Sequence, residues 1–261
     1  MEKEFNNNWA IILGGSSGFG LASAQKLAYH GMNIISIHRS RKNDLKEIDR
    51  IYDRMRKAGT QVLSFNIDAL NTEKRKETLE KISEKIPKAS VKLLLHSIAK
   101  GNLKSMLGNE PTLKHEDFVL TIEGMGISLY DWAKSVFEAQ MFSENARILA
   151  FTSEGNRRVW KKYAAVSAAK VALEAITRNI AFEFAAYKIT ANCIQCGITE
   201  TNSFKMIPGN EKLKKNALKR NPNKRLTQPE DIANVVYLLC REEANWINGT
   251  IVKADGGESL Q

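Results

Sequence analysis

The stretch Gly14-Gly15-Ser16-Ser17-Gly18-Phe19-Gly20 follows a short apolar run at residues 9–13 and precedes a segment with helical apolar spacing at residues 21–29. Glycine permits a tight turn and lets backbone N–H groups approach a ligand closely. The N-terminus of the following helix adds a dipole that favours an anion such as a pyrophosphate. Because the glycines lie between a first strand and a first helix, they predict a dinucleotide-binding loop rather than a Gly/Ser turn without a ligand.

Strand-like and helix-like segments alternate along the rest of the chain. Apolar runs predict seven strands, at residues 9–13, 32–37, 61–65, 91–96, 146–151, 189–195 and 250–253. Helical patterns lie between most of them, at residues 21–29, 43–58, 72–86, 115–138 and 161–186. The sequence Thr227-Gln228-Pro229-Glu230 resembles a capping box and predicts one more helix, which runs to about residue 239. Such alternation predicts parallel strands joined by right-handed crossovers. We expect a single doubly wound Rossmann-type α/β domain over residues 1–261, with a seven-stranded parallel sheet and its ligands beyond the carboxyl ends of the strands.

Length and composition limit the class of protein. The 261 residues are 43% hydrophobic, which is enough for a sizeable core. The sequence contains no apolar stretch long enough to cross a membrane. The N-terminus, Met1-Glu2-Lys3-Glu4, carries acids and no apolar run follows it. We therefore expect no signal peptide, no membrane partner and a cytoplasmic protein.

The cysteine positions argue against a metal site, and the net charge favours an acidic partner. Cys193-Ile194-Gln195-Cys196 is a C-x-x-C, but it falls in an expected strand and no second ligand pair follows, so we predict no metal. Lys and Arg number 39 against 29 Asp and Glu, a net charge of +10. That charge suits an acidic partner such as nucleic acid, an anionic surface or an acidic carrier protein. No nucleic-acid-binding motif or aromatic-basic interleaving accompanies it, so we expect no nucleic-acid partner.

The end of the second expected strand indicates which dinucleotide would bind. An NAD site usually places Asp or Glu there, for the ribose 2′-hydroxyl. This chain has His38-Arg39-Ser40-Arg41 instead. Arginine suits a 2′-phosphate because its planar fork donates two charge-assisted hydrogen bonds. We predict NADP(H), with Arg39 and Ser40 at the phosphate, against the alternative of a solvated basic turn. Asp68, after the third strand, is either an acceptor for the adenine amino group or an ordinary loop acid.

Tyr163 and Lys170 open the long Ala-rich helix. They are seven residues apart, close to two helical turns, so we expect both side chains on one face. An ammonium group near a phenol stabilises developing negative charge and lowers the phenol pKa. Taken alone, the pair is more typical of a helix with one exposed Tyr and one exposed Lys than of a catalytic site.

Four motifs together carry a resemblance to a known family. They are the glycine loop, the helix start at residues 163–170, the stretch 192–201 and the tail Ala254-Asp255-Gly256-Gly257. In order and spacing they resemble the short-chain dehydrogenase/reductase family along nearly the whole chain. Most members have Tyr-x-x-x-Lys, whereas the spacing here resembles the NADPH-using enoyl-acyl-carrier-protein reductase branch. Leu95-His96-Ser97-Ile98-Ala99 also resembles that branch.

The resemblance implies roles for particular residues. Tyr163 would donate to the oxygen of an enoyl thioester, Lys170 would hold the nicotinamide ribose, and Ser153 is a candidate second catalytic hydroxyl. Thr201 matches the residue that holds the nicotinamide carboxamide. The implied cofactor-binding residues are Gly14, Ser16, Ser17, Gly18, Phe19, Gly20, Arg39, Ser40, Asp68, Ser97, Ile98, Ala99, Lys170, Gly197, Ile198 and Thr201.

The sequence also departs from the family pattern at four positions. Leu13 replaces the opening Thr of the glycine loop, and Cys196 replaces the usual Pro before Gly197. Ser153 stands where many enoyl reductases have a second tyrosine. Glu123 aligns with a helix Asn that many members use in a proton relay, and it is either part of proton delivery or a surface residue.

The segment at about 198–225 lies where such folds carry a substrate-covering lid. Phe204, Met206 and Ile207 either line an acyl channel or are ordinary packing residues. A basic face follows, made of Lys212, Lys214, Lys215, Lys219 and Arg220. It suits docking of an acidic acyl-carrier protein, with a solvated helix as the alternative. The resemblance further implies a homotetramer.

Three functions remain open at this point. The first is NADPH-dependent reduction of a trans-2-enoyl thioester, as in fatty-acid or related acyl biosynthesis. The second is a ketoreductase of the same family, in which Ser153 and Tyr163 share a carbonyl oxygen. The third is a non-catalytic NADP-binding regulator, which the departures at Leu13, Glu123 and Cys196 allow.

Overall fold

The computed structural model describes residues 4–261 and contains one seven-stranded sheet. All neighbouring strands are parallel, in the order β3-β2-β1-β4-β5-β6-β7. The strands are β1 (Trp9–Leu13), β2 (Asn33–His38), β3 (Val62–Asn66), β4 (Val91–His96), β5 (Phe142–Ser153), β6 (Thr190–Cys196) and β7 (Ile251–Ala254). The expected doubly wound α/β fold is confirmed. The N-terminal residues 1–3, on which the signal-peptide expectation rests, lie outside the described residues.

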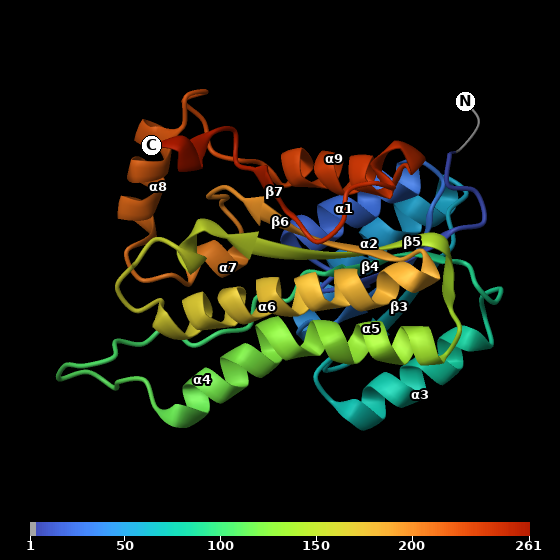
Figure 1. The fold of residues 1–261 in the computed structure, drawn as a ribbon, viewed down its shortest axis with the longest axis horizontal. Helices are drawn as coiled ribbons and strands as arrows, with labels where there is room; N and C mark the ends of the chain where they lie inside the picture. The colour runs from blue at the N-terminus through green and yellow to red at the C-terminus, as the bar shows by residue number, and fades with distance from the viewer. Residues whose placement is uncertain (1–3) are drawn as a thin grey trace.

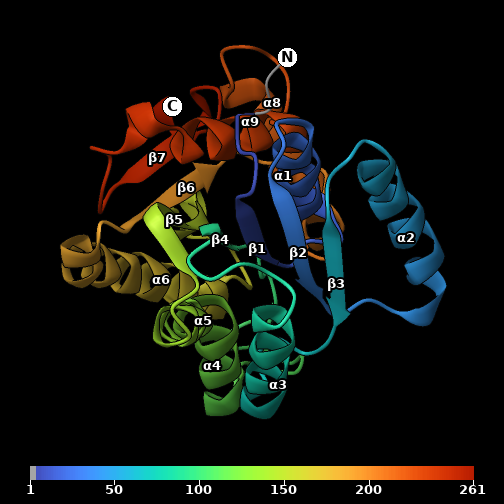
Figure 2. The same ribbon diagram turned by 90° about the vertical axis from the view of Figure 1, so that its right-hand side faces the viewer.

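Helices cover both faces of this sheet (Figures 1 and 2). The longer ones are α1 (Gly18–Tyr29), α2 (Lys42–Lys57), α3 (Thr72–Ser83), α4 (His115–Ile122), α5 (Ser128–Glu138), α6 (Ala164–Glu183), α8 (Asn210–Arg220) and α9 (Pro229–Cys240), and α7 (Asn202–Lys205) is a single turn. Successive residues of β1 point to opposite faces. Ile11 belongs to the core cluster that includes residues of α3, α5 and α6, and Ile12 to the cluster that includes residues of α1, α2 and α9. Within residues 4–261, no helix is both long and apolar enough to cross a membrane.

Three local expectations need correction. The long helix expected at residues 115–138 is interrupted by a π-helical turn, Glu123–Ile127, between α4 and α5. α6 begins at Ala164, not at residue 161, because Lys162 has a left-handed φ of +66° and Tyr163 is the N-cap. The N-cap of α9 is Gln228 rather than Thr227, and the carboxylate that accepts its N–H, at 2.8 Å, belongs to Asp231 rather than Glu230.

The carboxyl ends of β1, β4, β5 and β6 lie at one edge of the sheet. In the strand register Leu13 is opposite His96, and Ser153 is opposite Cys196. β5 is longer than the expected 146–151, and its two additional C-terminal residues bring Ser153 to this edge. The edge therefore gathers the ends of the strands and the loops that follow them, as ligand sites in open α/β sheets require.

Candidate functional site

The glycine loop leaves no room for side chains where it packs on its neighbours. Gly14 has a φ of +85°, and a β-carbon there would lie 3.0 Å from the carbonyl carbon of Ser97. A β-carbon on Gly20 would lie 2.9 Å from the carbonyl carbon of Gly14. At Gly18 a β-carbon would lie 3.6 Å from Thr201 Cγ2, an ordinary contact, so glycine is favoured there by its left-handed φ of +52° rather than by space. The loop can therefore present its backbone at the start of α1, as a pyrophosphate site needs.

One cleft connects this loop to the ends of β2, β3 and β4. Its lining includes Gly14, Ser16, Ser17, Gly18, Phe19, Arg39, Asp68, Ser97, Ile98, Ala99, Lys100 and Thr201. Most of the residues that the sequence assigned to the cofactor are thus together in one cleft. Gly197 and Ile198 line the neighbouring cavity described below, and Phe19, Ser97 and Thr201 line both.

The far end of the cleft carries cationic and hydroxyl groups. Arg39 Nη1 donates to Asp68 Oδ2 at 2.8 Å, and Lys100 Nζ lies 3.9 Å from the same oxygen. Ser40, which lies beside the cleft and is not among its lining residues, donates from its Oγ to Ser16 Oγ at 3.0 Å. The guanidinium and the two hydroxyls fit a phosphate group, and the glycine loop fits a pyrophosphate. Since Asp68 already pairs with Arg39, its role as a free adenine acceptor is less favoured than the sequence suggested.

Ser153 and Tyr163 lie side by side at the end of β5. Ser153 Oγ is 3.5 Å from the Tyr163 hydroxyl. Tyr163 is buried, and this burial raises the pKa of its phenol, against a smaller opposing effect of the Ser153 hydrogen bond. The phenol is therefore protonated near neutral pH and can donate a hydrogen bond.

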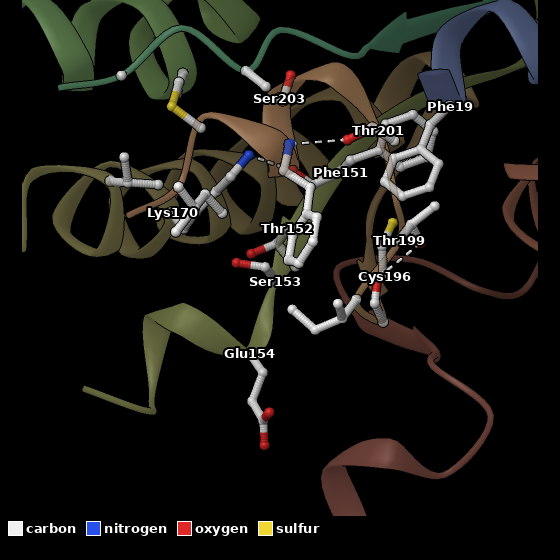
Figure 3. Close-up of a pocket in the computed structure, with 18 of the residues that line it drawn as sticks. Phe19, Phe151, Thr152, Ser153, Glu154, Lys170, Cys196, Thr199, Thr201 and Ser203 are labelled. Carbon is white, nitrogen blue, oxygen red and sulfur yellow. Dashed lines mark hydrogen bonds between the residues drawn. The ribbon is translucent and has the colours of Figure 1, made fainter. Parts of the chain in front are cut away.

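Lys170 lies on α6, directed toward the same edge of the sheet (Figure 3). Its Nζ donates to the carbonyl oxygen of Phe151 at 2.6 Å. Burial lowers the pKa of Lys170 to about 8, because the charged form loses hydration. A lysine with this pKa is still mostly charged at neutral pH and provides positive potential at the site.

A mainly apolar cavity of about 190 Å³ surrounds these groups. Tyr163, Ser153 and Lys170 line it together with Phe19, Ile98, Phe151, Val166 and residues of the segment 198–225. Phe204 and Ile207 of that segment line the cavity, whereas Met206 is 74% exposed and does not. An apolar chain therefore fits this cavity better than a charged substrate does.

Two acids near the cavity were not singled out by the sequence analysis. Glu154 follows Ser153 directly, and Figure 3 shows its carboxylate turned away from Lys170. Arg220 Nη2 donates to both Glu154 oxygens, at 2.7 and 2.8 Å. Glu258 Oε2 accepts from the Ile198 N–H at 3.0 Å, and burial raises the pKa of its carboxyl. The position of Glu154 next to Ser153 was the only signal in the sequence.

Several other residues that the sequence singled out lie outside the group formed by Ser153, Tyr163 and Lys170. Arg220 is only 16% exposed and belongs to the Glu154 ion pair, so it is not part of an exposed basic face. Lys214 of that face pairs with Glu200 at 2.6 Å. Glu123 is exposed on the π-helical turn, as a surface residue would be. Cys193 and Cys196 are both buried in β6, which confirms the strand position of the C-x-x-C.

Comparisons with known proteins find similar sequences and structures along nearly the whole chain. The family model described as "Enoyl-(Acyl carrier protein) reductase" matches residues 14–259. Human "Dehydrogenase/reductase SDR family member 2, mitochondrial" is 26% identical over 96% of this chain and 86% of its own length. A 7alpha-hydroxysteroid dehydrogenase of Paraclostridium sordellii is 26% identical over 98% of this chain and 94% of its own length. The crystal structure of the enoyl-[acyl-carrier-protein] reductase (NADH) from Aquifex aeolicus VF5 superimposes with a TM-score of 0.86, at 21% identity and 98% coverage of both chains.

Proposed function

The chain belongs to the short-chain dehydrogenase/reductase family of oxidoreductases, and from this premise we propose that it reduces the 2,3-double bond of a trans-2-enoyl thioester. The observation that carries the proposal is the placement of Tyr163 seven residues before Lys170, at the N-cap of α6. The shorter spacing of most family members would put Val166, which has no hydroxyl, in the place of the tyrosine. The mainly apolar cavity around Tyr163 supports an acyl substrate.

A nicotinamide dinucleotide, when bound, would supply the hydride that the β-carbon of the enoyl group accepts, and a proton from solvent or a relay would complete the saturated product at the α-carbon. Negative charge then moves to the thioester oxygen, and the protonated phenol of Tyr163 donates to that oxygen and stabilises it. Lys170 adds positive potential and holds the ribose hydroxyls. Ser153, 3.5 Å from the Tyr163 hydroxyl, orients the phenol. Phe19, Phe151 and Phe204 exclude water from the cavity.

We propose NADPH as the cofactor, since the family binds nicotinamide dinucleotides but differs in the choice between the two forms. Arg39 and the hydroxyls of Ser16 and Ser40 would hold the 2′-phosphate. Gly14, Ser17, Gly18 and Gly20 would hold the pyrophosphate, Ser97, Ile98 and Ala99 the adjoining part of the dinucleotide, and Gly197, Ile198 and Thr201 the nicotinamide end. The Aquifex enzyme carries NADH in its name, and steady-state kinetics with NADPH and NADH test the choice for this chain.

Two further features belong to the same proposal. Residues 198–225 would act as a substrate lid, which the contacts of Phe204 and Ile207 with the cavity support. A homotetramer would cover apolar side chains that are exposed on one chain, among them Tyr130 on α5 and Val171 and Phe182 on α6. Light scattering of the purified protein measures the assembly directly.

A ketoreductase is the second candidate, and one observation favours it. Ser153 and Tyr163 present two hydroxyls 3.5 Å apart, and such a pair can share one carbonyl oxygen. One of the relatives is named as a 7alpha-hydroxysteroid dehydrogenase, and oxidation of a hydroxysteroid at its hydroxyl group is carbonyl chemistry rather than enoyl chemistry.

One assay separates the two candidates. NADPH oxidation is followed with crotonyl and acetoacetyl thioesters side by side, for the wild type and Tyr163→Phe. We expect turnover of the crotonyl substrate and a loss of roughly 10²–10³ in the variant, the usual cost of removing one oxyanion donor. Turnover of the acetoacetyl substrate alone would establish the ketoreductase instead. Unchanged turnover in Tyr163→Phe would reject the role of the phenol.

A further inference from the structure

A chain of four polar side chains runs from the edge of the sheet to the glycine loop. It begins on β3, where Ser64 Oγ lies 2.9 Å from Nε2 of His38 at the end of β2. His38 Nδ1 lies 2.9 Å from Ser40 Oγ, and Ser40 Oγ lies 3.0 Å from Ser16 Oγ in the loop. β2 and β3 are neighbours at one side of the sheet (Figure 2), which brings these residues together. We call the four residues the His38 chain.

The geometry determines which atoms donate along the His38 chain. The Ser40 hydroxyl donates to Ser16 Oγ. Because a hydroxyl has one hydrogen, Ser40 must accept from His38, and Nδ1 of the imidazole therefore carries a proton. Burial lowers the pKa of His38, against a smaller opposing effect of Asp49, so the ring is neutral near neutral pH. Nε2 then has no proton and accepts from the Ser64 hydroxyl.

The Ser16 hydroxyl is the open end of the chain. Ser16 lines the cofactor cleft, whereas Ser40 does not. Its oxygen accepts from Ser40, and within residues 4–261 its hydrogen has no protein acceptor. Successive hydrogen bonds polarise one another, so a hydroxyl that already accepts is a stronger donor. The chain therefore presents a donor to the cleft, where a phosphate oxygen can accept it.

Other contacts hold the backbone at both ends of this short path. The Ser40 N–H donates to Asn66 Oδ1 at 2.9 Å, and Asn66 Nδ2 donates to the Ser40 carbonyl oxygen at 3.2 Å. In the loop, the Tyr52 hydroxyl donates at 3.1 Å to the carbonyl oxygen of Gly15, the residue before Ser16. With the backbone held on both sides, the direction of the hydrogen bonds depends on the imidazole between them.

We propose that His38 positions the Ser16 hydroxyl for the 2′-phosphate of NADPH and so contributes to the preference for NADPH over NADH. The imidazole donates to Ser40, which leaves the Ser40 hydrogen for Ser16 and the Ser16 hydrogen for the phosphate, in the same cleft as Arg39. NADH has no phosphate at this position and gains less from the donor. The inference rests on the proposed use of NADPH and names a positioning residue for it.

The test measures the dissociation constants of NADPH and NADH from the fluorescence of the reduced nicotinamide, without a substrate. His38→Phe removes both ring nitrogens and should weaken NADPH binding about tenfold, with NADH unaffected. His38→Asn keeps an N–H close to the position of Nδ1 and should stay within about threefold of the wild type. Ser64→Ala, at the other side of the ring, is the matched control. Since Ser64 is exposed, water can replace its hydroxyl, and neither constant should change by more than about twofold.

A double variant tests the path through Ser16. Ser16→Ala should weaken NADPH binding about as much as His38→Phe does, and the two substitutions together should cost no more than either alone, because both remove the same donor. A further loss in the double variant would overturn the inference. An equal loss of NADPH and NADH in His38→Phe would also overturn it, since a merely structural role moves both constants together.

The tautomer is measured on the wild type, so this part of the test needs no substituted protein to remain folded. The chain has four histidines, and nitrogen-15 spectra of their rings identify the protonated nitrogen of each. A proton on Nδ1 of His38 at neutral pH supports the chain, and a proton on Nε2 alone contradicts it.

The outcomes separate this inference from the function on which it rests. None of these measurements requires reduction of an enoyl thioester, so a failure of that reaction leaves the test intact. If the wild type binds NADPH no more tightly than NADH, the proposed cofactor is wrong and the inference falls with it. If the preference for NADPH persists in full in His38→Phe, the cofactor proposal stands and the role of His38 is rejected.

Discussion

The ring of Tyr163 lies directly against the backbone of Gly155. A β-carbon at residue 155 would overlap Cε1 of the ring and lie 3.0 Å from Cδ1. Gly155 belongs to the short 3₁₀ turn Glu154–Asn156 that follows β5, and its backbone φ is not in the left-handed region. Glycine is therefore needed here for space next to the phenol, and not for backbone conformation.

This contact predicts that Gly155→Ala moves the phenol without unfolding the protein. Turnover should fall about 10²-fold, because a misplaced catalytic group loses most of its effect. The thermal midpoint and the affinity for NADPH should change little. In the Tyr163→Phe background the same substitution should cost nothing further in turnover, since the two residues act as a unit. An additional loss in the double variant would mean that Gly155 acts on some other group.

Ser153→Ala tests how much the second hydroxyl contributes. In enoyl reduction the serine only supports the phenol across 3.5 Å, so we expect a loss of at most about tenfold with crotonyl thioester. In carbonyl reduction the serine holds the substrate oxygen, and the loss should approach that of Tyr163→Phe. Parallel kinetics of the two variants decide between these outcomes. Ser153→Thr, which keeps a hydroxyl, is the control.

The buried lysine predicts a pH dependence of cofactor use. Because burial lowers the pKa of Lys170 to about 8, its positive charge is present below that pH and is lost as the pH rises through it. The kcat/KM for NADPH, which reports groups of the free enzyme, should therefore fall above pH about 8. The Lys170→Arg variant keeps a positive charge at this position, so its kcat/KM for NADPH should not fall above pH about 8, although its turnover rate should be lower than that of the wild type. An unchanged inflection in that variant would assign the titration to another group.

Arg39 should set the preference for NADPH. Hydrogen bonds to charged groups contribute about 1.5–3 kcal/mol, so Arg39→Ala should raise the KM for NADPH roughly 10- to 100-fold and leave NADH unaffected. Asp68→Asn removes the carboxylate that pairs with Arg39 at 2.8 Å, and it should lower the KM for NADPH. Steady-state kinetics with both cofactors measure these changes. An equal rise for NADH and NADPH in Arg39→Ala would contradict a 2′-phosphate role.

Much of the fold follows from local patterns in the sequence. The glycine loop, the alternation of strands and helices, and the order of the motifs predict a doubly wound sheet, because short-range periodicity reports which faces are buried. All seven strands are present, and most of their ends agree within one or two residues. The sequence also singled out Ser153, Tyr163 and Lys170, because their positions match the motifs of the family that the chain resembles.

The tertiary structure decided what depends on residues that are distant along the chain. The sequence predicts that Arg220 belongs to a basic face, but in the structure it pairs with Glu154, which is 66 residues away. Arg39 likewise meets Asp68 only because β2 and β3 are neighbours in the sheet. Tyr163 became an N-cap because Lys162 adopts a left-handed backbone, which helical periodicity does not reveal. The sequence by itself determined the fold and indicated the candidate site residues, whereas the pairing of charges such as Arg220 with Glu154 depends on long-range packing, which places side chains from separate loops together.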